Sequence, residues 1–167
     1  MRWGLFALVP AIVILFSCAP SQSDTSETAD SQTLTVCRNV NIDLAITQCT
    51  SLIDSKNLSG MELAIVFIDR GDAYAKKSDF DHAIADYDSA IELAPDDAQA
   101  FGGRAFAYVG KEQYERAIED YDQAVILDRN FALAFYLRGM AKLALCDAEG
   151  GEIDINTARS LDPDVGR

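Results

Sequence analysis

The sequence predicts an all-α fold in which helix pairs stack into a solenoid, and three observations lead to this prediction. From residue 64 onward the sequence repeats with a period of about 34 residues, which is typical of stacked repeat architectures. Within each repeat, apolar residues recur at the spacing of a helical face. A single helix pair cannot bury its own apolar face, so neighbouring repeats must stack on one another.

The bulk composition fits one folded domain and argues against nucleic-acid binding. The chain has 167 residues, of which 49% are hydrophobic and 25% are charged, enough for a single buried core. Its formal net charge is −13. Proteins that bind phosphate backbones need a basic surface, so we expect no nucleic-acid partner.

Residues 1–17 are predicted to be a signal peptide. An uncharged apolar run of 14 residues, 3–16, follows the basic Arg2. A membrane-spanning helix needs about 20 apolar residues, and a short run behind a basic start is typical of a secretory signal. Pro10 also weakens a continuous helix through this run. A transmembrane anchor is the alternative interpretation.

The end of the apolar run reads Leu15-Phe16-Ser17-Cys18 and resembles the bacterial lipobox, although Phe16 departs from its pattern. The resemblance implies lipid attachment at Cys18 and a membrane-bound protein. Residues 18–35 carry almost no large apolar side chains after Cys18 and are predicted to be a disordered tether. We therefore expect an exported, periplasm-facing lipoprotein of the bacterial outer membrane. The alternative is a soluble periplasmic protein from which Cys18 is removed.

Residues 36–167 are predicted to form the repeat domain, with full repeats at 64–97, 98–131 and 132–165. Characteristic residues of the repeats are Phe67, Gly71, Tyr74, Ala83, Tyr87, Ala90, Pro95, Phe101, Ala105, Tyr108, Ala117, Tyr121, Ala124, Phe135, Gly139, Ala158 and Pro163. They resemble the signature of the tetratricopeptide repeat (TPR). The resemblance implies a right-handed superhelical solenoid of antiparallel helix hairpins, with about three repeats and an N-terminal divergent half-repeat. Departures from the signature are Arg129, Lys142 and Gly151.

Several boundary signals place the helix ends. Ser59 and Glu62 have the spacing of a capping box that opens the first repeat. Asp96 and Asn130 are expected to cap the next two repeats. Residues 43–53 resemble the second helix of a divergent repeat, and residues 37–57 are interpreted as a short capping element packed on the first repeat. The last helix is expected over about 150–161.

An arginine and an aspartate recur in every repeat, sixteen residues apart. The arginines are Arg70, Arg104 and Arg138, and the aspartates are Asp86, Asp120 and Asp154. We predict that each pair bridges the two helices of its own repeat. The alternative is that both side chains face water, where such pairs contribute about 0–1 kcal/mol.

The cysteines and the single histidine indicate no metal, cofactor or catalytic site. Export makes a disulfide between Cys37 and Cys49 plausible, with two buried thiols as the alternative. Cys146 is expected to be a buried thiol, and His82 is expected at an exposed helical position. No nucleophile elbow, phosphate loop or dinucleotide fingerprint is present, so we predict no enzyme activity and no cofactor.

The TPR resemblance implies a concave groove lined by the first helix of each repeat. The candidate partner-binding residues are Ile65, Ile68, Asp69, Asp72, Gln99, Phe106, Val109, Leu133, Tyr136, Leu137 and Met140. None is Lys, Asn or Arg, as the carboxylate clamp of chaperone-binding TPRs requires, so acidic peptide ends are not expected ligands. An extended or helical segment with apolar anchors and a basic end suits this groove.

Two glycines on the second repeat's first helix have alternative explanations. Gly102 and Gly103 each weaken a helix by about 1 kcal/mol relative to Ala. They either lower the groove floor where a ligand backbone approaches or are a tolerated weak spot, and the second interpretation is favoured.

The function predicted from these features is a non-catalytic scaffold or adaptor in the bacterial cell envelope, with a protein or peptide partner and a lipid anchor. A self-associating structural envelope protein is the alternative. The apolar residues Ile153, Ile155 and Leu161 of the last helix suggest the hypothesis of a homodimer through the C-terminal edge.

Overall fold

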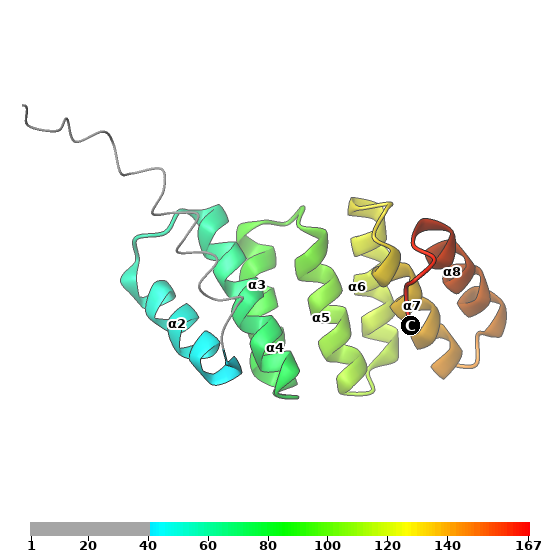
Figure 1. Ribbon diagram of the computed structural model, residues 1–167, viewed down its shortest axis with the longest axis horizontal. Coiled ribbons are helices and arrows are strands. Elements are labelled where there is room, and N and C mark those ends of the chain that lie inside the picture. The colour runs from blue at the N-terminus through cyan, green and yellow to red at the C-terminus, as the bar shows by residue number, and fades with distance from the viewer. Residues whose placement is uncertain (1–40) are drawn as a thin grey trace, which may run out of the picture.

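The computed structural model describes residues 41–167, and every regular element in this range is an α-helix (Figure 1). The helices are α2 (Ile42–Ser55), α3 (Gly60–Lys76), α4 (Phe80–Leu93), α5 (Ala98–Gly110), α6 (Tyr114–Leu127), α7 (Ala132–Ala144) and α8 (Ala148–Leu161). They stand in chain order along the long axis of the molecule. The predicted all-α repeat solenoid is therefore confirmed. The predicted signal peptide and tether lie outside the described residues.

The first helix of each repeat lies on the inner side of the array. Each helix packs against the next one in the chain, and α3 also meets α5, as α5 meets α7. The second helices α4, α6 and α8 do not meet one another in the described part of the chain. Because α3, α5 and α7 converge while their partners spread apart, the array curves with the first helices on its concave side.

The core consists of alanines that let helices approach closely and of tyrosines that fill the gaps. Alanines at the predicted signature positions, including Ala83, Ala117 and Ala124, are fully buried. The largest fully buried side chains are Tyr87 on α4 and Tyr121 on α6. Two clusters result, one around each tyrosine, and they follow one another along the array as stacked repeats require.

The capping box predicted at the start of the first repeat is present. The Ser59 hydroxyl accepts from the Glu62 backbone N–H, and the Glu62 carboxylate accepts from the Ser59 N–H at 2.7 Å. Upstream, the Asn41 side chain caps α2 by accepting from the Asp43 N–H. These caps satisfy donors that a helix start leaves unpaired and fix where α2 and α3 begin.

The predicted caps at Asp96 and Asn130 are wrong. The cap of α5 is Asp97, whose side chain accepts from the Gln99 N–H. The equivalent position before α7 is Phe131, which offers no side-chain cap. A turn precedes each helix, closed by the Asp97 and Phe131 N–H groups on carbonyls three residues earlier. This turn moves each helix start one residue beyond the prediction.

The last helix begins earlier than the predicted residue 150, because Asp147 caps α8 by accepting from the Gly150 N–H. Gly151 lies inside the helix, where it crosses Gly139 of α7. A Cβ placed on Gly139 would be 2.8 Å from the Gly151 carbonyl oxygen. The departure from alanine at Gly151 therefore permits an unusually close helix crossing.

The three predicted arginine–aspartate bridges are confirmed. Arg104 on α5 donates from Nε and Nη2 to both carboxylate oxygens of Asp120 on α6, each at 2.7 Å. Arg70 and Asp86, and Arg138 and Asp154, form the same two-pronged contact. The aspartates are buried and the arginines largely so, which excludes the alternative in which both partners face water.

Each arginine also contacts the preceding repeat. Arg104 Nη1 donates to Asp88 of α4 at 2.6 Å, and Arg138 Nη1 donates to Asp122 of α6 at 2.7 Å. We call these contacts, together with the bridges within repeats, the arginine ladder. One guanidinium thus joins three helices, so the ladder ties each repeat to its neighbour as well as holding its own helices together.

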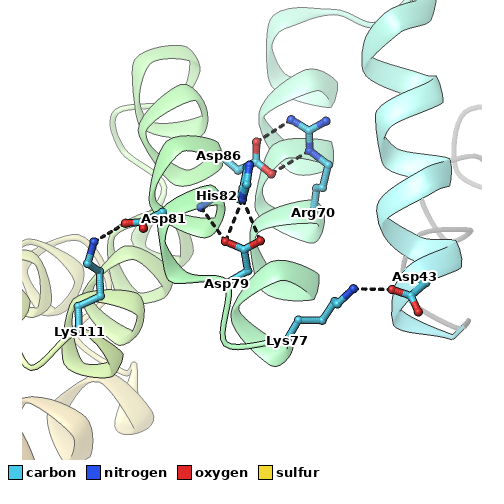
Figure 2. Close-up of polar contacts among 8 residues, drawn as sticks. All are labelled: Asp43, Arg70, Lys77, Asp79, Asp81, His82, Asp86 and Lys111. Atoms are coloured by element: carbon cyan, nitrogen blue, oxygen red, sulfur yellow. Dashed lines mark hydrogen bonds and ion pairs between the residues drawn. The ribbon is translucent and has the colours of Figure 1, made fainter.

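The ladder extends to α2 and supports its interpretation as a second helix. Arg70 Nη1 donates to the Thr50 hydroxyl of α2 at 3.0 Å, so Thr50 has the role that Asp88 has one repeat later. Figure 2 shows Arg70 facing Asp86 between α3 and α4, while Lys77 reaches from the end of α3 to Asp43 of α2. Both contacts hold α2 against the first full repeat as a cap.

Candidate functional site

A pocket of about 620 Å³ opens on the concave side, between the first helices of the three repeats. Six of the predicted groove residues line it: Ile68, Asp72, Gln99, Phe106, Leu133 and Leu137. Phe106 and Leu133 are 45% and 49% exposed, although both are large and apolar. Exposed apolar side chains gathered in a concavity are a usual feature of binding sites.

Five predicted groove residues do not line this pocket. Asp69 is buried, whereas Ile65, Val109 and Tyr136 are half-buried and Met140 is exposed. Tyr136 lies against the C-terminal segment, since a Cβ placed on Gly166 would overlap the tyrosine ring. For these five, participation in partner binding stays a prediction.

Sequence reasoning missed residues that reach the pocket from elsewhere in the repeats. They are Lys76, Tyr87, Tyr121, Phe131 and Ala134. The two tyrosines belong to the second helices, α4 and α6, yet their side chains pass between first helices to the concave side. Their recurrence at one repeat position made them visible as gap-filling signature residues, but it did not indicate that they also line the groove.

The Tyr87 hydroxyl has a partner inside the protein. It donates to Asp72 of α3 at 2.6 Å, and the ring is almost fully buried. Burial raises the pKa of Tyr87, and the neighbouring Asp72 carboxylate raises it further. The tyrosine therefore stays protonated and holds the Asp72 carboxylate at the edge of the pocket.

The structure explains why residue 103 is a glycine, for a reason that neither sequence interpretation included. A Cβ at this position would be 2.5 Å from Cε1 of Tyr87, and one at Gly71 would be 3.0 Å from the same atom. Gly102 faces the Phe131 ring, at 3.1 Å from its added Cβ. Because Gly71 and Gly103 pack against the Tyr87 ring, Gly103 is required for packing and is not a tolerated weak spot.

Tyr121 repeats the position of Tyr87 but not its hydrogen bond. Phe106 occupies the position in the second repeat that Asp72 occupies in the first, and its side chain offers no acceptor. The Tyr121 Oη has no hydrogen-bond partner among the described residues, although Tyr121 is only 1% exposed. Burial, followed by the nearby Asp120, raises the pKa of Tyr121, so the hydroxyl keeps its proton.

The charged groups of the pocket lie on α3 alone. Asp72 and Lys76 both line it and are exposed, and the lining contributed by α5, α6 and α7 is uncharged. Lys76 is one cation, which is short of the set that a carboxylate clamp needs. The pocket thus has one polar end and an apolar floor.

The cysteines differ in part from the prediction. Cys49 is fully buried on α2 against Val66 and is disulfide-bonded. Cys18 and Cys37 lie outside the described residues, so lipidation at Cys18 and the pairing of Cys37 with Cys49 stay predictions. The predicted burial of Cys146 is wrong. This residue is exposed with a free thiol, because it forms the turn between α7 and α8 with a φ of 65°.

His82 is exposed, as expected, and its side chain contacts Tyr74 and Asp79. Its ring stacks on Tyr74 with centroids 5.0 Å apart, and its Nδ1 lies 2.9 Å from the Asp79 carboxylate (Figure 2). This hydrogen bond lowers the pKa of Asp79. Within residues 41–167 no cluster of His, Cys, Asp or Glu could hold a metal ion.

None of the helices from α2 to α8 is both long enough and apolar enough to cross a bilayer.

Comparison with known proteins decides the family. The family model described as TPR repeat matches residues 71–111 and 107–145. The second TPR domain of human RPAP3, solved with an HSP70 peptide, is 30% identical, with a TM-score of 0.61. The match covers 65% of this chain and 90% of that domain. The chain belongs to the TPR family.

Other solved TPR proteins share the fold. The TPR domain of Arabidopsis OM64 is 26% identical over 65% of this chain and 89% of that domain, with a TM-score of 0.63. MamA of Desulfovibrio magneticus is 19% identical over 84% of this TPR chain and 77% of its own, with a TM-score of 0.68. At that identity MamA shows the fold alone. The comparison with curated proteins gives no significant match.

Proposed function

We propose that this TPR protein is a non-catalytic scaffold of the bacterial cell envelope that binds a segment of a partner protein in its concave pocket. The observation that carries the proposal is the 620 Å³ pocket with Phe106 and Leu133 exposed inside it. Burying those two side chains in a complex would give a favourable hydrophobic contribution. The TPR fold is in general a protein-interaction fold without catalysis of its own, which supports the same conclusion.

The solved neighbours support a peptide ligand, and the chemistry of this pocket narrows its type. The RPAP3 domains were solved with the peptides SGPTIEEVD and SRMEEVD, which end in acidic residues. In this chain the predicted groove positions carry no Lys, Asn or Arg, and the whole chain has a net charge of −13. We therefore propose a segment with apolar anchors and a basic end near Asp72.

A pull-down from detergent-solubilised envelopes tests the proposed function. The double variant Phe106→Ser/Leu133→Ser removes two exposed side chains from the pocket, so we expect it to lose partners that the wild type retains. The matched control is Met61→Ser/Ile126→Ser, because these residues are 59% and 65% exposed but lie outside the pocket. Equal recovery of partners by both double variants would contradict binding in the pocket.

The envelope location rests on the sequence of residues 1–35 and needs its own test. We propose that Cys18 is lipidated and that residues after it tether the repeats to the membrane. A lipidated protein enters the detergent phase on Triton X-114 partitioning, whereas Cys18→Ser should stay in the aqueous phase. Mass spectrometry of the mature N-terminus distinguishes acylated Cys18 from cleavage beyond it, which would contradict the anchor.

Self-association is a second candidate function, favoured by the apolar surface of α8. Ile153 is 59% exposed and Leu161 is also exposed, so the last helix presents an apolar edge. Sedimentation velocity tests whether this edge forms a dimer. A concentration-dependent dimer that Ile153→Ser abolishes would support self-association, and a monomer at high concentration would refute it.

A further inference from the structure

The segment that follows α8, residues 162–167, turns back onto α7, and we call it the strap. A Cβ placed on Gly166 would overlap the ring of Tyr136, so the strap backbone lies directly against this tyrosine. Figure 1 shows the same arrangement, with the red chain after α8 turning toward α7. Tyr136 stands on α7 between Leu133 and Leu137, which line the pocket. The strap therefore lies beside the apolar end of the pocket.

The position of Tyr136 in its repeat places it on the concave side. It is equivalent to Gly102 of the second repeat, which lines the pocket. In the second repeat the Phe131 ring covers the glycine, at 3.1 Å from a Cβ added to it. In the third repeat the large residue is Tyr136 on the helix, and the small one is Gly166 in the chain that covers it. The strap thus occupies the place that Phe131 occupies one repeat earlier.

The strap reaches this place through the same turn that precedes α7. In the earlier turn the Asp128 carboxylate accepts from the Asn130 N–H at 2.9 Å. In the strap the Asp162 carboxylate accepts from the Asp164 N–H at 2.9 Å. The earlier turn continues into a helix, whereas Gly166 has a φ of 79°. Glycine adopts this left-handed conformation most easily, and here it carries the backbone onto α7.

The strap is held by few buried contacts. Val165 is half-buried, and the other five residues of the strap are exposed. Its ion pair, between Arg167 and Asp164 at 2.6 Å, joins two exposed side chains, and such pairs contribute little stability. Segments with few buried contacts open at low free-energy cost. The strap can therefore leave Tyr136 while the helices from α2 to α8 stay folded.

The strap also has the chemistry proposed for the partner segment. The apolar Val165 lies two residues before the basic Arg167, and the proposed partner likewise combines apolar anchors with a basic end. Residues three apart on a helix are about 5–6 Å apart. A partner segment that covers Leu133 would therefore reach Tyr136 and meet the strap.

We propose that the strap is an internal competitor of the partner segment, which covers the α7 end of the concave surface and must leave before a partner can bind there. This inference rests on the proposed function and names how that site is regulated. The competition needs no second protein, because the strap follows α8 in the same chain.

Gly166→Val should release the strap. Its Cβ would overlap the Tyr136 ring, and a β-branched residue disfavours the positive φ. Nitration of Tyr136 by tetranitromethane, located by mass spectrometry, measures the release. A ring that reacts when the strap is open reacts in proportion to the open fraction, so we expect nitration about threefold to tenfold faster. Gly60→Val is the matched control and should nitrate as the wild type does, because a Cβ there meets nothing within 4 Å.

Partner binding tests the competition itself. Partners that are lost by Phe106→Ser/Leu133→Ser are titrated against the wild type, Gly166→Val and Gly60→Val. We expect Gly166→Val to bind them about threefold to tenfold more tightly, and Gly60→Val to match the wild type. Unchanged nitration of Tyr136, or faster nitration with binding no tighter than in the wild type, would overturn the inference while pocket binding stands. If the double variant retains every partner, the proposed function fails and the inference fails with it.

Discussion

At the scale of single residues, the concave pocket depends on how closely Tyr87 approaches α3 and α5. The ring packs on two glycines, Gly71 and Gly103, and its hydroxyl reaches Asp72. A glycine in a helix interior is normally unfavourable. Here the absent side chain allows a buried aromatic contact, and that contact fixes the position of a charged group in the pocket.

Gly103→Ala should therefore destabilise the protein although alanine is the better helix former. Its Cβ would be 2.5 Å from the Tyr87 ring, and overpacking of this kind costs about 1–3 kcal/mol. The free energy of unfolding in urea measures the effect. Gly60→Ala is the matched control, because a Cβ there meets nothing within 4 Å and should be neutral or stabilising. Equal effects of both substitutions would show that the ring contact is unimportant.

At the scale of elements, the turn inside each repeat has one recurring backbone feature. Ser78, Glu112 and Cys146 have φ values of 61°, 59° and 65°, and they occupy the same position in successive repeats. Each follows a first helix and closes it in the left-handed conformation, which glycine adopts most easily. This turn, and not a helix, is where Cys146 lies, and it explains why the thiol is exposed.

Glu112→Gly should stabilise the protein by up to about 1 kcal/mol, because glycine removes the steric cost of the positive φ. Thermal unfolding followed by circular dichroism measures the gain. Glu119→Gly is a suitable comparison, since residue 119 is an exposed position in the interior of α6 and glycine there should destabilise by about 1 kcal/mol. A loss of stability in both variants would contradict the proposed role of the turn.

The arginine ladder joins neighbouring elements, and Arg104 is its middle member, in contact with Asp88 of α4 and Asp120 of α6. Arg104→Ala should cost about 3 kcal/mol, because it leaves the buried Asp120 carboxylate without its partner. The comparison is Lys77→Ala, which breaks the exposed pair with Asp43 and should cost less than about 1 kcal/mol. Urea unfolding of both variants provides the measurement, and similar losses would mean that the ladder is not stabilising.

At the scale of the whole molecule, the arginine ladder makes the free energy of unfolding depend on pH in the acidic range. Burial acts to raise the pKa of Asp154, but hydrogen bonds from Arg138 and Lys142 outweigh it and lower that pKa below the ordinary value of 3.8. A carboxylate with a lowered pKa in the folded state stabilises the protein above its unfolded pKa. This contribution is lost as pH falls through the folded value.

The midpoint of thermal unfolding should therefore decrease as pH is lowered below about 4. Asp154→Asn removes the titrating group, so the variant should start from a lower midpoint at pH 7 and lose less on acidification. Circular dichroism melts between pH 7 and pH 2.5 check both expectations. Parallel pH profiles for the wild type and Asp154→Asn would show that this carboxylate is not involved.

Much of the fold could be predicted because the same contacts recur in each repeat. The spacing of Arg104 and Asp120 was enough to predict their bridge, since both belong to one repeat. The second contact of Arg104, with Asp88, was missed because it depends on how successive repeats are rotated against each other. Periodicity in a sequence records which positions are equivalent, but not that rotation.

The pocket was predictable only in part, for a related reason. Phe106 and Leu133 were placed correctly on the concave side because they face it from first helices. Tyr121 comes from a second helix, and only its packing shows that it reaches the pocket. Within residues 41–167 the Tyr121 hydroxyl has no internal acceptor because the repeat is broken at Phe106, which replaces an aspartate. This difference can be recognised only once the Tyr87 contact with Asp72 is known.

The arginine ladder has a consequence for how such a chain evolves. Residues 98–131 contain Arg104, Asp120 and Asp122, so a single repeat carries one arginine and both of its carboxylate types. If this segment were duplicated in tandem, the new arginine would meet the original Asp122, and the new copy of Asp122 would meet Arg138. The lineage would thus lengthen its array by in-frame duplication without needing a compensating mutation at the junction.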